Sequence, residues 1–387
     1  RNDVANAAAL SLAEAGIDKA IYELNQSGSY TGETDAPLGD GVYTIVVSNV
    51  GTNTKRVTVT ASIPTVANPV SVKSATALVN IGTSVVSFHY GAQVGAGGVV
   101  LNNSSRIEGN VFSNGSISGT GTITGDVTVA SGTPTTSISG VTVGGTARAH
   151  SLSSCTIGGD AYYQTISSCS VAGVQYPGTA DTAPGTMPIS ESQIDEWEEI
   201  AAEGTVINNS LNLSGSSSQT LGPAVINGNL TVSNTASLTL SGIVWVKGNI
   251  NFSNSAQLRV SATTGNAGSI LIADVPGSES SVGTVTLSNS FVASGNGSPG
   301  SFPMILSTNS GSSAINLSNN TDSVILYASR GTIQVNNGAG ANQLTGYRLM
   351  LNNNSSVTYV SGLQDAAFSS GPGGSWTVVP HTYSILR

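Results

Sequence analysis

The stretch GNLTVSNTASLTL, residues 228–240, returns 20 positions later as GNINFSNSAQLRV, residues 248–260. Both copies contain a Gly-Asn pair, a short alternating apolar run, a Ser-Asn pair and a second alternating run. Alternation with a period of two is typical of a β-strand, and a repeat of this length is typical of stacked supersecondary units. The two copies therefore predict successive coils of a β-solenoid, in which each coil buries its apolar residues against its neighbours.

Asparagine marks the predicted corners in the second half of the chain. It tolerates the left-handed backbone conformation of a sharp corner, and its side-chain amide can pair with the same amide one coil away. We expect both roles from the asparagines that follow short alternating strands, which are Asn234, Asn254, Asn289, Asn319, Asn336 and Asn353.

A second frame, apolar-x-Gly, recurs between residues 100 and 176. It begins at Ile107, Ile123, Val143, Ile157 and Val171, at uneven steps along the sequence. Uneven spacing around a steady frame predicts a solenoid whose corners absorb changes in length.

The composition limits the classes of protein and partner. Charged residues make up 9% of the 387 residues and apolar residues 39%, with a mean hydropathy of +0.11. Disordered chains combine low hydrophobicity with high charge, so we expect this chain to fold. The formal net charge is −9 and no cluster of Lys or Arg is present, so nucleic acid is not an expected partner.

The N-terminal segment has the periodicity of a helix. Leu10, Ile17, Ile21 and Leu24 fall on one face of the stretch at residues 5–25. Three alternating runs follow, and they are VYTIVV at 42–47, RVTVTASI at 56–63 and SVKSATALVNI at 71–81. Together they predict one helix followed by a three-stranded antiparallel sheet.

The stretch ISESQIDEWEEIAAEG, residues 189–204, interrupts the strand pattern. Ser190 and Gln193 fit a capping box at its start, and Gly204 can end the helix. We expect a short amphipathic helix, with Ile194, Trp197 and Ala201 on one face, that bridges two solenoid blocks.

The expected fold is therefore mainly β, a β-solenoid with an N-terminal α+β unit. We place the α+β unit at residues 1–90, a first solenoid block at 91–176, a loop and bridging helix at 177–205, and a second block at 206–387. No run of 18 or more apolar residues is present, and residue 1 is arginine. We expect a segment upstream of Arg1 to have been removed, and membrane contact only through that segment.

Several stretches resemble a known family. SLAEAGIDKAIYEL at 11–24, followed by GVYTIVV at 41–47 and KRVTVTAS at 55–62, resembles the region after the membrane helix in type IV minor pilins and PilX-like surface proteins. INGNLTVSN at 226–234 and VILYASRGTIQVNN at 324–337 resemble solenoid regions behind such pilin heads. The pilin resemblance covers about 80 of the 387 residues. It implies a pilin-like α+β unit, an upstream membrane-spanning segment, and a helix face that packs on the sheet or on neighbouring pilin subunits through Leu10, Ile17, Ile21 and Leu24.

The two cysteines fall at equivalent positions of successive coils. Cys155 in SSCTIGGD and Cys169 in SSCSVAGV are separated by the same step as the frames that begin at Ile157 and Val171. Stacked strands bring such positions to ~4.8 Å, within the range of a disulfide. We expect a disulfide between coils and hence an oxidising compartment, with a pair of buried thiols as the alternative. No histidine lies at metal-ligand spacing, so no metal site is expected.

No catalytic constellation is evident. His89, His150 and His381 have no nucleophile or carboxylate at a spacing typical of catalysis, so we expect structural roles. Asp126 and Asp160 follow equivalent glycines and are expected to be corner residues rather than a catalytic pair. We therefore predict neither enzyme activity nor a cofactor.

Tyr162 and Tyr163 are adjacent in a predicted strand, so one ring should point inward and the other outward. An exposed tyrosine ring can stack on a sugar ring, which makes the pair a candidate glycan contact. Packing in the core or at its rim is the alternative.

These features predict a non-enzymatic, extracellular structural subunit at the cell surface or in a pilus, anchored in the membrane before assembly. We expect a minor or tip component of a type IV pilus-like filament with an adhesive role. Its expected partners are other pilin subunits, through the N-terminal helix, and a surface glycan or host ligand. Two alternatives stay open. The EGNV and TGDV frame also resembles bactofilins, which are self-assembling solenoid scaffolds, and β-helix folds include polysaccharide-binding and polysaccharide-active proteins.

Overall fold

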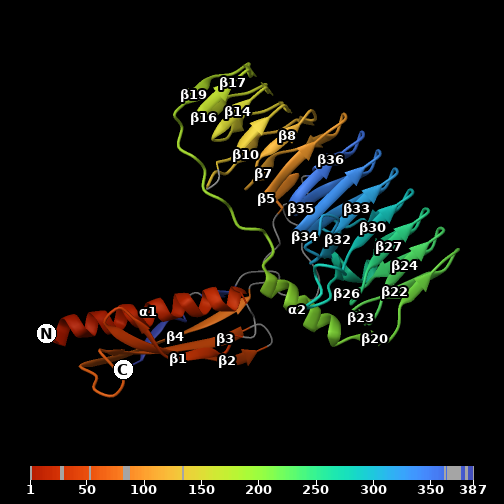
Figure 1. Cartoon of the computed structure of the whole chain (residues 1–387). Helices are drawn as coiled ribbons and strands as arrows, with labels where there is room; N and C mark the ends of the chain where they lie inside the picture. Colours follow the sequence, from red (N-terminus) through yellow and green to blue (C-terminus); the bar gives the residue numbers. More distant parts are fainter. Residues whose placement is uncertain are drawn as a thin grey trace. The chain divides into compact units, whose positions relative to one another are not determined.

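The computed structural model describes residues 2–26, 30–51, 54–81, 88–132, 135–360, 363, 376–379 and 382–386. The chain forms two compact units, each of which is mainly β (Figure 1). The helix–sheet unit comprises Arg1–Val85, Ile189–Trp197 and Gly371–Arg387, and the solenoid unit comprises Val86–Pro188 and Glu198–Ser370. Both ends of the chain belong to the helix–sheet unit, and the solenoid unit is built from two segments that are separated in the sequence by residues 189–197 of the helix–sheet unit.

In the helix–sheet unit one helix packs on an antiparallel sheet. Its elements are α1 (Asn2–Gln26), β1 (Gly32–Leu38), β2 (Gly41–Gly51), β3 (Thr54–Ile63), β4 (Ser71–Ile81), β37 (Trp376–Val378) and β38 (Ser384–Leu386). β1 to β4 form a meander, and both C-terminal strands pair with β4.

The sequence predicts β2, β3 and β4. The sheet therefore has three further strands, which are β1, β37 and β38. β1, with the sequence GETDAPL, lacks apolar alternation, and the two C-terminal strands are only three residues long. The boundary at residue 387 for the second solenoid block also differs from the structure, because β37 and β38 belong to this sheet.

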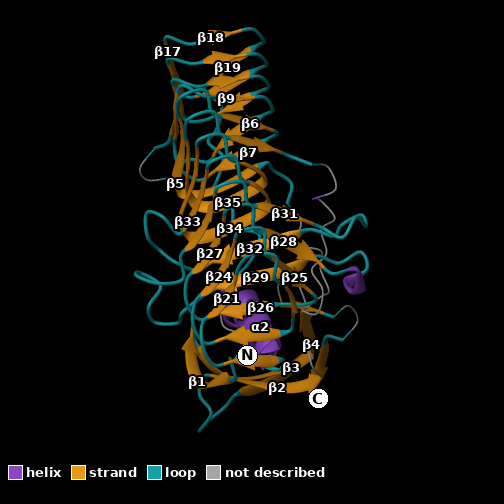
Figure 2. Cartoon of the chain, turned by 90° about the vertical axis from the view of Figure 1, so that its right-hand side faces the viewer, coloured by secondary structure: helices purple, strands orange, loops and turns teal. Residues whose placement is uncertain are grey.

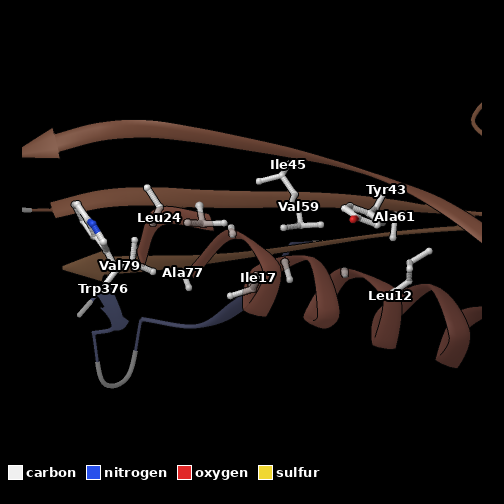
Figure 3. Close-up of a cluster of buried hydrophobic side chains, with 14 residues drawn as sticks. Leu12, Ile17, Leu24, Tyr43, Ile45, Val59, Ala61, Ala77, Val79 and Trp376 are labelled. Carbon is white, nitrogen blue, oxygen red and sulfur yellow. The ribbon is translucent and has the colours of Figure 1, made fainter. Parts of the chain in front are cut away.

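α1 turns one apolar face to the sheet, where it meets Tyr43, Val59 and Trp376 (Figure 3). Its buried members in this cluster are Leu12, Ala13, Ile17, Ala20 and Leu24. Ile21 packs against the cluster and is half-buried, whereas Leu10 is half-buried and lies outside it. The buried face of α1 is centred on Gly16, where an added Cβ would lie 2.5 Å from Val59 Cγ1. This close approach of helix and sheet favours Leu12 over Leu10 as the inward residue.

The solenoid unit is a column of coils whose short strands stack into parallel sheets (Figure 2). The first block contains β5 (Ala92–Leu101), β6 (Arg106–Glu108), β7 (Val111–Ser113), β8 (Ile117–Gly119), β9 (Thr122–Ile123), β10 (Val127–Val129), β11 (Ser137–Ser139), β12 (Thr142–Val143), β13 (Ala147–Arg148), β14 (Ser151–Ser153), β15 (Thr156–Ile157), β16 (Ala161–Tyr163), β17 (Thr165–Ser167), β18 (Ser170–Val171) and β19 (Gln175–Pro177).

The second block contains β20 (Thr205–Ile207), β21 (Leu211–Leu213), β22 (Ser218–Leu221), β23 (Ala224–Ile226), β24 (Leu230–Ser233), β25 (Ser237–Leu240), β26 (Val244–Val246), β27 (Ile250–Ser253), β28 (Gln257–Val260), the short helix η1 (Ala262–Thr264), β29 (Ser269–Ala273), β30 (Val285–Ser288), β31 (Val292–Ser294), β32 (Pro303–Ser307), β33 (Ile315–Ser318), β34 (Asp322–Asn336), β35 (Gly340–Leu351) and β36 (Ser356–Thr358). In most coils a strand pairs with the strand three positions ahead, so inward residues such as Ile138, Leu152 and Ile166 form rows.

The coils do not stack in the order of the sequence. β35 pairs with β5 and β36 pairs with β6, so the last coil of the second block lies on the first coil of the first block (Figure 1). The chain thus enters the column in its middle, and the two blocks form one continuous solenoid. It enters near Phe88 and leaves near Tyr359, whose hydroxyl donates a hydrogen bond to the Phe88 carbonyl.

A ladder of asparagine side chains runs along the corners of this column. Each amide Nδ2 donates at 2.8–3.3 Å to the Oδ1 of the next member, in the order Asn103, Asn353, Asn337, Asn319, Asn289, Asn254 and Asn234. Asn234 ends the ladder, and its Nδ2 donates to the Ser214 hydroxyl. All seven have φ between 50° and 62°, the left-handed conformation that the sequence predicts. Asn336 is the exception, because Asn337 takes the corner and Asn336 donates instead to Asn316 in a second ladder.

α2 (Glu191–Ala202) separates the two blocks in the sequence, although in space the blocks stack directly. Ser190 caps it, since the Ser190 hydroxyl accepts the backbone N–H of Gln193 at 3.3 Å. Ile194, Trp197 and Ala201 are all buried, as expected for the apolar face.

Candidate functional site: the end coil of the solenoid

The first block ends in an open coil, residues 165–177, which we call the end coil. Its strands β17, β18 and β19 pair with β14, β15 and β16, and within the described part of the chain nothing pairs with their outer edges. Ile166 and Val171 continue the rows of Leu152 and Ile157, each 1% exposed, yet they are only half-buried themselves. The interior of the column therefore reaches the surface here.

The end coil has a short perimeter and no charge. The register steps from Ala147 to Ala161 to Gln175, and this step of 14 residues is also the separation of the two cysteines. At the other end of the column Thr205 aligns with Ala224, and the side chains of Asn208 and Asn227 are hydrogen bonded across the same step of 19 residues. Residues 161–177 contain no charged side chain, although the chain as a whole carries a net charge of −9.

A disulfide holds the end coil to the coil before it. Cys155 and Cys169 are bonded, with their Cα atoms 4.5 Å apart, as their spacing in the sequence predicts. Ser154 and Ser168, the residues before them, have φ of 50° and 55° and form equivalent corners. The bond therefore joins two matched corners and keeps the end coil in register.

An aromatic row lies on the outer surface beside the disulfide. The Tyr162 ring stacks on the Tyr176 ring with centroids 4.5 Å apart and planes at 6°. The Arg148 guanidinium lies 4.2 Å from the Tyr162 ring centroid. Register places Arg148, Tyr162 and Tyr176 in one row, so the guanidinium and Tyr176 cover Tyr162 from successive coils. The charge of the nearby Tyr162, and to a lesser degree burial, raise the pKa of Tyr176.

The structure changes which tyrosine is available to a ligand. Tyr163 is 7% exposed, and its hydroxyl donates to Gln175 Oε1 at 2.9 Å, so it is a core residue. Tyr162 points outward, but its ring is covered by its neighbours. Tyr176, which the sequence reasoning missed, is 40% exposed and ends the row. The step between coils that aligns the cysteines also aligns these tyrosines.

The chain leaves the end coil as a strap, residues 178–188, which returns along the first block. Successively earlier residues of the block bind it, because Gln164, Ser131, Asn114 and Gln93 hydrogen bond to Thr179, Thr182, Gly185 and Thr186 respectively. His150 Nδ1 also lies 2.9 Å from Asp181 Oδ2 in the strap. His150 therefore has a carboxylate neighbour that its isolated place in the sequence does not reveal, and the contact joins the strap to the column. His381 lies outside the described residues.

The aligned aspartates serve the corners. Asp126 Oδ1 accepts the backbone N–H of Thr146, and Asp160 Oδ1 accepts that of Val174, each at 2.8 Å. Each carboxylate therefore satisfies the backbone of the next coil. Among the described residues no three His, Cys, Asp or Glu side chains gather as a metal site.

A shallow polar groove of about 410 Å³ lies farther along the column. Asp322, Gly340 and Ser356 are aligned on three successive coils. Because glycine has no side chain, the groove is open between the side chains of Asp322 and Ser356. Asn342 and Thr358 line the same groove. Such an array of hydroxyl, amide and carboxylate groups has the chemistry that hydrogen bonds to sugar hydroxyls.

Within the described residues no helix has the length and apolar character that crossing a membrane requires. No protein-family model matches the chain, and no curated protein matches it. Among solved structures, the competence-associated pilin ComZ from Thermus thermophilus is similar at 12% sequence identity and a TM-score of 0.35. That alignment covers 100% of this chain and 98% of that chain. A TM-score of this size carries no argument about function.

Proposed function

We propose that this chain is a non-enzymatic structural subunit of a bacterial cell surface. In this proposal α1 assembles with other pilin subunits of a type IV pilus-like filament, and the solenoid projects as an adhesive minor or tip component. The observation that carries the proposal is the two-sided character of α1, together with the resemblance of its sequence to minor pilins.

The outer face of α1 is suited to a second helix over its first half. Val4, Ala7, Ala8 and Ser11 are exposed and uncharged, Val4 is 74% exposed, and the exposed carboxylate of Asp3 lies at the edge of this patch. Small residues let helix backbones approach closely, and an exposed apolar residue marks an interaction surface. Glu14, farther along, is exposed and charged, so the expected contact is confined to the N-terminal half.

The solenoid supports an extracellular role. Its disulfide favours an oxidising compartment, because such bonds are rare in the cytosol. Corner ladders and in-register strands stabilise the column through local contacts and need few charges. The polar groove at Gly340 and the exposed Tyr176 ring are the surfaces that we expect to meet a surface glycan or host ligand.

The filament role is tested in cells that produce the protein. Filaments are sheared from the surface, and the chain is detected in them by immunoblot. We expect wild type in the filament fraction and Ala8→Glu absent from it, because the carboxylate blocks helix packing. Val46→Glu, at a 55% exposed position of the sheet, is the matched control and should be retained. Retention of Ala8→Glu at the wild-type level, or absence of the wild type, contradicts the proposal.

The two alternatives are less well supported. A bactofilin-like scaffold that polymerises head to tail requires the two ends of the column to accept each other, whereas their coils differ in length. A polysaccharide-active enzyme requires acid and base groups aimed at a substrate, whereas Asp126 and Asp160 accept backbone hydrogen bonds.

A further inference from the structure

We propose that the end coil binds the end coil of a second copy of this chain, so that two solenoids join in a closed two-fold pair. The filament role is not needed for this proposal. Three features of the end coil support it, namely its unpaired strand edges, its perimeter and its lack of charge.

The first feature is the row of strand edges. β17, β18 and β19 each pair on one side only, so their outer backbone groups face away from the column, and Pro177 at the end of β19 is the one position without an N–H. Such edges are templates for pairing with another chain. The Cys155–Cys169 disulfide fixes the end coil in register, so a partner meets an ordered edge.

The perimeter identifies the partner. A molecule that pairs with all three edges at once must present three strands around a coil of the same size. The coil at the other end of this column is longer, so stacking head to tail is mismatched. The end coil of a second copy has the same perimeter, so its three strands can meet these three edges. Two copies that face each other are related by a two-fold axis, so the pair is closed and does not extend into a fibre.

The chemistry of the surface also fits a second copy. Copies of a chain with a net charge of −9 repel one another, but residues 161–177 carry no charge. Val174 is 56% and Tyr176 40% exposed, and half-buried Ile166 and Val171 lie at the same end. Contact between two such ends removes apolar surface from water without burying a charge.

The expected affinity is weak, because the contact is small. Stable interfaces bury at least about 1,000 Å² in total. A coil that repeats every 14 residues has a small cross-section, so we expect a contact below that size. We expect a dissociation constant of about 10–500 μM for the isolated chain. Many copies on facing surfaces would raise the effective strength of such contacts.

The test is sedimentation equilibrium of the full 387-residue chain up to about 1 mM, which exceeds the expected dissociation constant. Wild type should show a monomer–dimer equilibrium.

Val174→Lys places a charge in the contact and should weaken dimerisation at least tenfold. It also lowers the net negative charge, so greater overall repulsion cannot explain the loss. Val206→Lys, at a 50% exposed position of the opposite end, is the matched control and should dimerise as wild type. Circular dichroism and thermal unfolding verify that both variants fold.

Each contrary result overturns the proposal. A wild type that stays monomeric rules out pairing, and equal weakening by both lysine variants rules out the end coil as its site. A monomeric wild type that binds a glycan, with binding lost in Tyr176→Ala, assigns the end coil to a sugar instead. Because Ala8→Glu leaves the end coil intact, it should dimerise normally even if it fails to enter filaments. Failure of one proposal is therefore distinguishable from failure of the other.

Discussion

The side chain of Asn103 donates a hydrogen bond of 2.9 Å to Oδ1 of Asn353, across 250 residues of sequence. Asn353 in turn donates to Asn337, so the corner ladder passes from the first block into the second without a break. The junction between the blocks is therefore built like any other contact between coils.

Replacement of Asn353 should weaken the column at this junction. Asn353→Ala loses two side-chain hydrogen bonds and places alanine at φ 54°, so we expect a loss of about 2–4 kcal/mol in the free energy of unfolding. Asn353→Gly keeps the backbone conformation and should lose about 1 kcal/mol less. Urea denaturation measures both. Asn251→Ala, at an exposed strand position, should stay within about 0.5 kcal/mol of wild type. If Asn251→Ala and Asn353→Ala lose the same free energy of unfolding, the corner conformation and its ladder are not the cause of the loss.

Loss of the disulfide should loosen the end coil first. Closing a loop of this size is worth roughly 3 kcal/mol in the chain-entropy model, and the coil has neighbours on one side only. In the double variant Cys155→Ser with Cys169→Ser we expect faster amide hydrogen exchange and proteolysis within residues 165–177. Exchange around Val246, in the middle of the second block, should not change. The expectation fails if both regions respond equally.

The helix–sheet unit should lose stability in alkali through Tyr30. Burial, followed by the nearby Glu33 carboxylate, raises the pKa of Tyr30 from its ordinary value of 10.0 to about 12. The folded state then holds the proton more tightly, so this contribution to stability is complete below pH 10 and is lost as the pH rises to about 12. Tyr30→Phe should flatten the fall of the urea midpoint over that interval.

Other groups set the background of that measurement. Hydrogen bonds to Glu33 and Tyr43 raise the pKa of Lys19. Deprotonation of Lys19 at high pH therefore also lowers the stability of the folded state. Tyr30→Phe keeps Lys19, so this part of the loss remains in the variant. Tyr22→Phe, at a 61% exposed position, is the control and should leave the curve unchanged. If wild type and Tyr30→Phe give parallel curves, Tyr30 is not the source.

The polar groove can be filled without disturbing the backbone. A Cβ at Gly340 would meet Ser356 Oγ at 3.5 Å, an ordinary contact, and threonine favours strands. Gly340→Thr should therefore unfold within about 1 kcal/mol of wild type. If the groove holds a surface glycan, this variant should lose at least tenfold in affinity for the glycan identified with wild type on an array. Asn251→Thr, outside the groove, should bind normally. Unchanged binding by Gly340→Thr excludes the groove as the glycan site.

The sequence predicts the contacts that repeat between neighbouring coils. Asn234, Asn254 and Asn289 could be assigned to corners because each follows an alternating strand and recurs, and Cys155 and Cys169 share a register for the same reason. Asn336 was misplaced because it is adjacent to Asn337, and only the backbone conformation shows which of the two turns the corner.

Non-repeating contacts could not be predicted. The pairing of β35 with β5 joins segments that are far apart in the sequence, and one coil edge resembles another. The His150–Asp181 pair depends on the path of the strap, which has no periodicity. Tyr176 could have been found, because it follows Tyr162 by the same step that separates the two cysteines.

Phe88 and Tyr359 touch where the chain enters and leaves the column. The solenoid unit therefore starts and finishes at adjacent points, although residues 189–197, which lie between these points in the sequence, belong to the helix–sheet unit. Because the chain enters the column between its two blocks, duplication of a coil at either end of the column leaves these two points in place. The length of the column can thus change while the points at which the chain enters and leaves it stay the same.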